Sequence, residues 1–227
     1  MTEADFERLR RRLVAEVAAD AERTADYTHR ASFGTRVMAA LGQVPRERFV
    51  PDSAWRSAYD NRPLAIGHGQ TISQPYIVAL MTDLLDLTPS DRVLEIGTGC
   101  GYQTAVLAEL TQEVFTVEVI PELQDAARAR LAALGYTNIQ YHSGDGWRGW
   151  PEEAPFDTII VTAAAAQLPT ALVDQLAPQG RMIVPIGRQY ETQFLTRLTR
   201  DPDGTVREEK GLPVAFVPLV KKPVDDA

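Results

Sequence analysis

The chain has 227 residues and a mass of 25.0 kDa, a size that suits one enzyme-sized domain. Its 44% hydrophobic and 24% charged residues are ordinary values for a globular protein, and they exclude a disordered or fibrous chain. The net charge of -8 argues against a broad nucleic-acid-binding surface, because phosphate binding depends on clustered Lys and Arg.

One cysteine and the lack of a long apolar run bear on where the protein works. Cys100 has no partner in the sequence for a disulfide, which is usual in a reducing compartment. No apolar run reaches about 18 residues, and the acidic start MTEADFE lacks the basic segment of a signal peptide. We therefore expect a cytoplasmic monomer that binds neither nucleic acid nor a membrane.

The first part of the sequence predicts a helical extension. Apolar residues recur at helical spacing over residues 5–20, which predicts an amphipathic helix. Arg8, Arg10, Arg11 and Arg12 alternate with acids in that stretch, as on a solvated helix face. A second, short helix is expected over residues 35–41.

A loop and a third helix are predicted next. Residues 65–73, AIGHGQTIS, contain two glycines and several small polar groups, which is the composition of a loop. Ser73 is a plausible N-cap, and Pro75 suits the first turn of a helix that continues to about Leu87.

Strand and helix patterns then alternate until about Gly187. The predicted strands are RVLEIG, VFTVEV, NIQYHSG, DTIIVT and RMIVPIG, and the predicted helices cover residues 102–110, 121–134 and 169–176. Strands separated by helices are typical of parallel βαβ units, so we expect an α/β fold with a doubly wound, mostly parallel sheet. The turn signal at residues 201–204, between 193–200 and 206–217, predicts a C-terminal antiparallel hairpin.

A glycine-rich turn follows the first of these strands. In VLEIGTGCGYQT, the residues Gly97, Gly99 and Gly101 let a ligand approach the backbone closely at the end of a strand. A P-loop would need a Lys followed by Ser or Thr, but Tyr102 and Gln103 follow here. A dinucleotide-binding motif would need its third glycine where Tyr102 stands, so neither phosphate-binding motif fits.

Acidic residues end three successive predicted strands. Glu95 precedes the glycine turn, where a carboxylate would repel a pyrophosphate but attract a cationic sulfonium and an amino group. Glu118 lies about 20 residues after the turn, where an acid can accept hydrogen bonds from ribose hydroxyls. Asp145 ends the third strand, where a carboxylate can meet the exocyclic amine of adenine. Together these residues predict a pocket for S-adenosyl-L-methionine.

Further motifs resemble one methyltransferase family. GQTISQP at residues 69–75, the glycine turn, GDGWRGWPEEAPFDTIIVTAA and FVPLV at residues 216–220 resemble the bacterial protein-L-isoaspartate O-methyltransferases. The similarity runs from about Val44 to Lys221. It implies a class I methyltransferase with a Rossmann-like fold, which methylates the free α-carboxylate of isoaspartyl residues in damaged proteins and peptides. The ester then closes to a succinimide, which starts repair.

The resemblance also implies roles for single residues. Ser73 matches the active-site serine, Thr71 and Ile72 lie beside the methyl donor, and residues 216–220 lie near the cofactor and the peptide groove. The predicted cofactor-binding residues are Thr71, Ile72, Ser73, Glu95, Gly97, Thr98, Gly99, Gly101, Glu118, Val119, Asp145, Gly146 and Thr162. We expect no metal site, because the three histidines have no ligand spacing.

The residues leave several alternatives open. An isoaspartyl carboxylate is already ionised at about pH 7, so the reaction needs alignment and exclusion of water rather than a general base. Ser73 can donate a hydrogen bond to an acceptor oxygen, or it can serve only as a helix cap. The acceptor can also be a dedicated peptide or a small carboxylic acid, and a noncatalytic binding module is a third hypothesis. We predict one catalytic domain over residues 1–227, with an extension (1–74) and a cofactor-binding core (75–227).

Overall fold

The computed structural model describes residues 1–221, so residues 222–227 of the predicted domain lie outside the described part of the chain. The helices are α1 (Glu3–Arg23), α2 (Ala25–Thr28), α3 (Thr35–Gln43), α4 (Pro75–Leu84), α5 (Tyr102–Ala108), α6 (Pro121–Ala133) and α7 (Thr170–Asp174), with short 3₁₀ segments η1 (Arg46–Phe49), η2 (Asp52–Ser57) and η3 (Pro151–Glu153). The strands are β1 (Leu64–Gly67), β2 (Gln70–Ile72), β3 (Arg92–Ile96), β4 (Glu113–Glu118), β5 (Ile139–Ser143), β6 (Phe156–Val161), β7 (Leu176–Ile186), β8 (Gln193–Arg200) and β9 (Val206–Val214).

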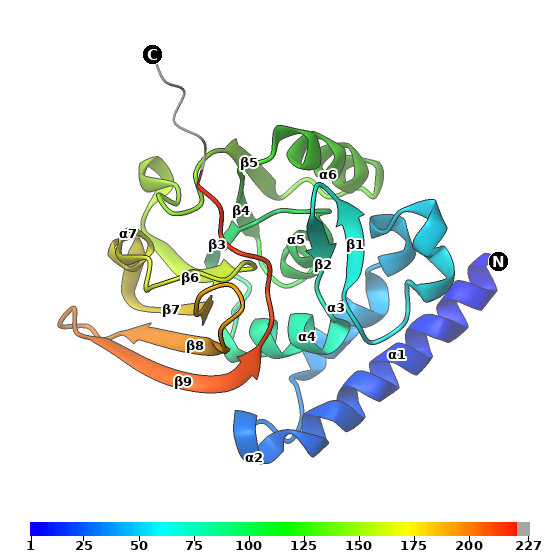
Figure 1. Ribbon diagram of the computed structural model, residues 1–227, viewed down its shortest axis with the longest axis horizontal. Helices are drawn as coiled ribbons and strands as arrows, with labels where there is room; N and C mark the ends of the chain where they lie inside the picture. Colours follow the sequence, from blue (N-terminus) through cyan, green and yellow to red (C-terminus); the bar gives the residue numbers. More distant parts are fainter. Residues whose placement is uncertain (222–227) are drawn as a thin grey trace.

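The central sheet has seven strands in the order β5-β4-β3-β6-β7-β8-β9 (Figure 1). Neighbours from β5 to β7 are parallel, and β8 is antiparallel to both β7 and β9. The predicted α/β fold with a doubly wound, mostly parallel sheet and a C-terminal hairpin is confirmed. The chain leaves β3 toward β4 on one side and later places β6 on the other side. The carboxyl ends of β3 and β6 therefore flank the switch point at which such sheets bind ligands.

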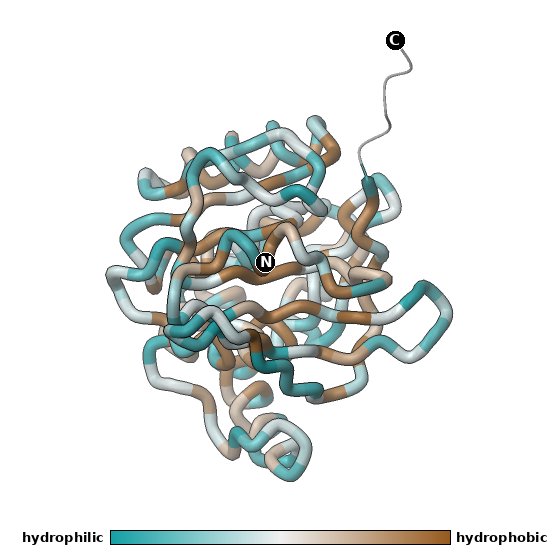
Figure 2. The backbone as a smooth tube through the Cα atoms, turned by 90° about the vertical axis from the view of Figure 1, so that its left-hand side faces the viewer, coloured by the Kyte–Doolittle hydropathy of each residue, from teal (hydrophilic) through white to brown (hydrophobic). Residues whose placement is uncertain are grey.

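The two faces of the sheet belong to different hydrophobic clusters, because successive strand residues point to opposite faces. On β3, Val93 packs with residues of α1, α3, α4 and α5, whereas Leu94 packs with residues of β6, β7 and α7. Figure 2 shows that the hydrophobic segments gather in the interior strands, and that many outer loops are hydrophilic. Phe6 of the extension and Val93 of the sheet share one cluster. The division of the chain at residue 74 stays a prediction.

Two predictions for the segment before α4 are wrong. Residues 65–73 are not a simple loop, because β1 and β2 pair antiparallel with Leu64 opposite Ile72. The hairpin turn is tight, since Gly67, His68 and Gly69 all have positive φ angles of 95°, 52° and 70°. Ser73 is not the N-cap of α4: Gln74 occupies that position and makes no side-chain capping hydrogen bond. The hydroxyl of Ser73 is thus not used as a helix cap.

The C-terminal segment also differs from the prediction. The second hairpin strand, expected to reach residue 217, ends at Val214, and residues 216–220 form a single isolated bridge between Ala164 and Pro218 rather than a strand. After β9 the chain runs back across the view of Figure 1 toward β5. Pro218, within residues 216–220, lacks the N–H group that a continuous ladder needs.

A buried polar network anchors α1 to η1. Arg10 Nε donates to the Tyr59 hydroxyl at 2.9 Å, and Arg10 Nη2 lies 3.5 Å from Glu47 Oε1. The Tyr59 hydroxyl donates in turn to Glu47. Burial and the hydrogen bond to Glu47 raise the pKa of Tyr59 above its ordinary value. The prediction of a solvated face is therefore wrong for Arg10, whereas Arg8, Arg11 and Arg12 are exposed.

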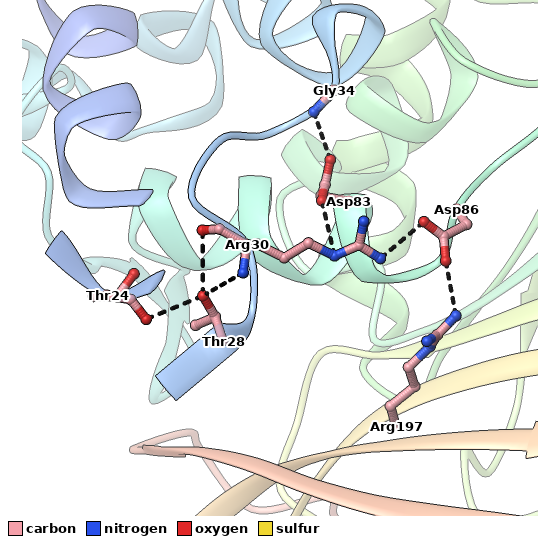
Figure 3. Close-up of polar contacts among 7 residues, drawn as sticks. All are labelled: Thr24, Thr28, Arg30, Gly34, Asp83, Asp86 and Arg197. Carbon is pink, nitrogen blue, oxygen red and sulfur yellow. Dashed lines mark hydrogen bonds and ion pairs between the residues drawn. The ribbon is translucent and has the colours of Figure 1, made fainter. Parts of the chain in front are cut away.

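A second network joins the extension to α4 and β8 (Figure 3). Asp83 accepts a hydrogen bond from the Gly34 backbone at 2.6 Å, and its other oxygen lies 3.5 Å from Arg30 Nε. Arg30 and Arg197 both pair with Asp86, at 2.9 and 2.8 Å. The segment between α2 and α3 is thereby held against the core. Within residues 1–221, the structure contains no helix with the length and hydropathy needed to cross a membrane.

Candidate active site

The glycine turn after β3 has a backbone that favours glycine. Gly97, Gly99 and Gly101 have φ angles of 98°, 54° and 89°, in the left-handed region. A Cβ on Gly97 would lie 2.4 Å from Thr162 Oγ1. Thr162 cannot easily move away, because its hydroxyl donates to the carbonyls of Ile96 and Gly97, at 3.0 and 2.7 Å. The ends of β3 and β6 are thus closely joined at Gly97.

Glu118 ties the glycine turn to the end of β4. Its Oε2 accepts a hydrogen bond from the Gly99 backbone at 2.8 Å, and its Oε1 accepts from Val119 and Ile120, each at 3.0 Å. A carboxylate has about four acceptor positions, so Glu118 retains capacity for a ligand hydroxyl. The side chain is held without losing its ability to bind.

A cavity opens at this switch point. The predicted site residues that line it are Thr71, Ile72, Ser73, Gly97, Thr98, Gly99, Glu118, Val119, Gly146 and Thr162. The lining residues that the prediction did not name as ligand contacts are Gln70, Val78, Ile96, Cys100, Tyr102, Gln103, Val117, Ile120, Ala163 and residues 217–220. Glu95, Gly101 and Asp145 are not among its lining residues.

Glu95 lies beneath the turn rather than in the cavity. Its side chain is fully buried, and Oε2 accepts hydrogen bonds from the hydroxyls of Thr104 and Thr116, at 2.5 and 2.7 Å. Burial raises the pKa of Glu95 to about 8, with a smaller contribution from the charge of Glu118. Glu95 therefore carries a proton at neutral pH, and the cavity is not surrounded by the three charged carboxylates that the sequence suggested.

Gly101 and Asp145 shape the site from outside the cavity. A Cβ on Gly101 would lie 2.9 Å from Leu131 Cδ1, so this glycine allows α6 to pack closely against the start of α5. Asp145 Oδ1 accepts a hydrogen bond from the Trp147 backbone at 2.9 Å. That contact stabilises the turn in which Gly146 faces the cavity.

The C-terminal segment forms one wall of the cavity. Ala164 donates to the Val217 carbonyl and accepts from the Leu219 N–H, both at 2.8 Å, and the Trp147 indole donates to the Leu219 carbonyl at 3.0 Å. The resemblance of FVPLV to a family motif was the only sequence signal for this wall, since its contacts join residues that lie far apart in the chain.

Ser73 and Thr71 lie between two hollows. Both residues line the cavity at the glycine turn, and both also line a neighbouring groove. The other residues of that groove are Asp20, Thr24, Pro63, Gln74, Tyr76, Ile77 and residues 212–216. A group bound in the groove would thus lie against Ser73 and Thr71 at the edge of the cavity.

The cavity fits S-adenosyl-L-methionine better than a phosphate-containing cofactor. One acid, Glu118, lines it, and no Lys or Arg does so among residues 1–221. A pyrophosphate would lack a counter-charge, whereas a sulfonium cation is favoured beside a carboxylate. The glycine turn and the apolar wall of Val117, Ile120 and Leu219 suit a flat, uncharged ring system. The same described residues contain no group of three or more His, Cys, Asp or Glu that could hold a metal ion.

Comparisons with known proteins show the family of this chain. A family model for protein-L-isoaspartate(D-aspartate) O-methyltransferases matches residues 25–224. The chain is 54% identical over 210 residues to protein-L-isoaspartate O-methyltransferase 1 of Cupriavidus necator, covering 92% of this chain and 81% of that relative. It is 56% identical over 186 residues to the protein-L-isoaspartate O-methyltransferase of Gloeobacter violaceus, covering 82% and 90%.

A solved structure extends the similarity to the fold. A Plasmodium falciparum protein named for the same activity, in complex with S-adenosyl-L-homocysteine, matches with a TM-score of 0.75 and 27% identity. The match covers 91% of this chain and 97% of that one. The family match spans most of the chain and the relatives are more than half identical, so this chain belongs to the protein-L-isoaspartate(D-aspartate) O-methyltransferase family.

Proposed function

We propose that this protein transfers a methyl group from S-adenosyl-L-methionine to the free α-carboxylate of L-isoaspartyl residues in damaged proteins and peptides. The product ester closes to a succinimide and so starts repair. The observation that carries the proposal is the position of Ser73 and Thr71 at the junction of the cofactor cavity and the neighbouring groove. Family membership supports the isoaspartyl acceptor.

The chain's own residues have to bind the methyl donor and the acceptor, orient them toward each other and exclude water. When bound, S-adenosyl-L-methionine supplies an electrophilic methyl group. Glu118 and the glycine turn would hold the cofactor, and Ser73 would donate a hydrogen bond to one oxygen of the acceptor carboxylate, leaving the other oxygen free. The acceptor is ionised at about pH 7, so no residue needs to remove a proton. Alignment in an apolar cavity provides the catalysis.

We also propose that the protein acts as a cytoplasmic monomer without a nucleic-acid or membrane partner. The net charge of -8 and the cavity without basic residues disfavour a polyanion. Light scattering across a dilution series would test the monomer, with a mass twice that of the chain as the contrary result.

A matched pair of peptides tests the activity. Two peptides of one sequence, with an isoaspartyl or a normal aspartyl residue at the same position, are incubated with radiolabelled methyl donor. We expect label in the isoaspartyl peptide alone. Equal labelling of both peptides, or labelling only of small carboxylic acids in an acceptor screen, would contradict the proposal.

A further inference from the structure

Arg46 is a fully buried cation without a carboxylate partner. It begins η1, its relative exposure is 0%, and no Asp or Glu within residues 1–221 forms an ion pair with it. Its guanidinium donates to three backbone carbonyls: Nε to Ala58 at 2.9 Å, and Nη2 to Ser73 at 2.8 Å and to Arg62 at 3.4 Å. Nη1 is buried and has no hydrogen-bond partner.

Stability alone does not account for this side chain. Removing a guanidinium from water costs several kcal/mol, and a well-packed apolar residue at such a position is often neutral or stabilising. The ring of Tyr102, 4.8 Å from the guanidinium carbon, offsets part of the cost through a cation–π contact. Burial still lowers the pKa of Arg46, as expected for a cation that is only partly compensated.

The contacts of Arg46 reach both Ser73 and a residue that lines the cofactor cavity. Ser73 lies between β2 and α4 and belongs to neither element, so the ladders of regular structure do not hold it. Within residues 1–221, Arg46 is the only side chain that hydrogen-bonds to Ser73. Tyr102, beneath the guanidinium, begins α5 and lines the cofactor cavity. One side chain therefore connects Ser73, between β2 and α4, with the first residue after the glycine turn.

We propose that Arg46 is a positioning residue of the methyl transfer: through the Ser73 carbonyl and the Tyr102 ring it fixes the Ser73 hydroxyl relative to the cofactor cavity. The role rests on the proposed function. Arg46 itself contacts no reacting atom and acts through Ser73. A charged donor suits the task because a charge-assisted hydrogen bond is about twice as strong as a neutral one.

Arg46→Met is the main test, because an unbranched apolar side chain can pack on Tyr102 without an uncompensated charge. We expect a folded variant whose kcat/KM for the isoaspartyl peptide falls by about 20-fold, within the loss expected when the Ser73 hydroxyl itself is removed. Calorimetry should show that its affinity for S-adenosyl-L-methionine changes by less than about threefold. Arg46→Lys is the second variant, which keeps the charge but loses the planar set of guanidinium donors. Its kcat/KM should fall by about tenfold.

Two controls separate positioning from a general effect on the fold. Arg48→Gln changes an exposed arginine of the same η1 segment and should keep the wild-type kcat/KM. In a Ser73→Ala background, adding Arg46→Met should lower kcat/KM by less than about threefold. The effects of residues that act as a unit are not additive.

The proposal is overturned if Arg46→Met and Arg46→Lys keep wild-type kcat/KM, if the losses of Arg46→Met and Ser73→Ala multiply, or if cofactor affinity falls as much as transfer. Wild-type protein that does not methylate the isoaspartyl peptide would contradict the proposed function instead. The same variants would then be compared on the carboxylate that the wild type does methylate, so the two failures are distinguishable.

Discussion

The side of the cavity at the glycine turn, here called the cofactor wall, and the side around Ser73, here called the acceptor wall, are built differently. The cofactor wall comes from strand ends that are neighbours in the sheet, and backbone groups close it, as at Gly97, Gly99 and Glu118. The acceptor wall centres on Ser73, which a buried arginine 27 residues earlier in the chain holds in place. Local sequence determines the first wall, whereas the second depends on how the extension packs. Changes in the two walls should therefore affect different quantities.

The largest effect is expected in the cofactor wall. Gly97→Ala places a Cβ 2.4 Å from Thr162 Oγ1 on a backbone with φ of 98°, so the turn or Thr162 must shift. We expect affinity for S-adenosyl-L-methionine to fall by roughly 100-fold, equivalent to about 2.7 kcal/mol. Calorimetry measures it. Gly135→Ala is the control, because φ there is 88° but nothing lies within 4 Å of the new Cβ. Gly135 does not line the cavity, so this control should keep wild-type affinity, and equal affinity of the two variants would contradict the predicted clash at Gly97.

The matching change in the acceptor wall is Ser73→Ala. Loss of one hydrogen bond to a charged acceptor, about 2 kcal/mol, predicts a fall in kcat of roughly 30-fold. Affinity for S-adenosyl-L-methionine should stay within about twofold of wild type, since the cofactor wall is untouched. Steady-state kinetics and calorimetry check both values. Ser53→Ala in η2, an exposed serine, is the control. Wild-type kcat in Ser73→Ala would remove the serine from the mechanism.

Asp83→Asn tests the joint between the extension and the core. Asp83 is 7% exposed and accepts from the Gly34 backbone while it faces Arg30. Loss of its charge should lower the free energy of unfolding by about 2 kcal/mol, because Arg30 loses a buried partner. Asp86→Asn, whose side chain is 43% exposed, should cost less than about 1 kcal/mol. Denaturant titrations measure both, and equal losses would show that burial of Asp83 is unimportant.

The last prediction concerns how stability changes with pH rather than its value at one pH. The pKa of Glu95 is raised from 4.5 to about 8, so the folded protein holds a proton that unfolding releases. This contribution is complete below about pH 4.5 and is lost as pH rises toward 8, by at most about 1.4 kcal/mol per pH unit. Glu95→Gln has no such titration, so its stability relative to wild type should rise with pH across that window. Denaturant titrations at several pH values, with exposed Glu122→Gln as control, measure it. Parallel curves for wild type and Glu95→Gln would contradict the raised pKa.

Several site residues could be predicted because their signals are local. A glycine cluster at a strand end and an acid at the end of the next strand place Gly97, Gly99 and Glu118 at one edge of a parallel sheet, whatever the rest of the chain does. The same reasoning wrongly predicted that Glu95 lines the cavity. A strand residue faces either the ligand or the interior according to sheet geometry, and here Thr104 and Thr116 surround it.

The sequence by itself determined the alternation of strands and helices after α4, the hairpin at the end and the chemistry of the cofactor turn, because hydrophobic period and turn residues act over short distances. Tertiary structure alone decided what holds Ser73, which arginine of α1 contacts Tyr59 and Glu47, and how residues 217–220 wall the cavity. Those contacts join segments far apart in the chain. They form only when the whole fold brings their partners within hydrogen-bonding distance, so no local pattern encodes them.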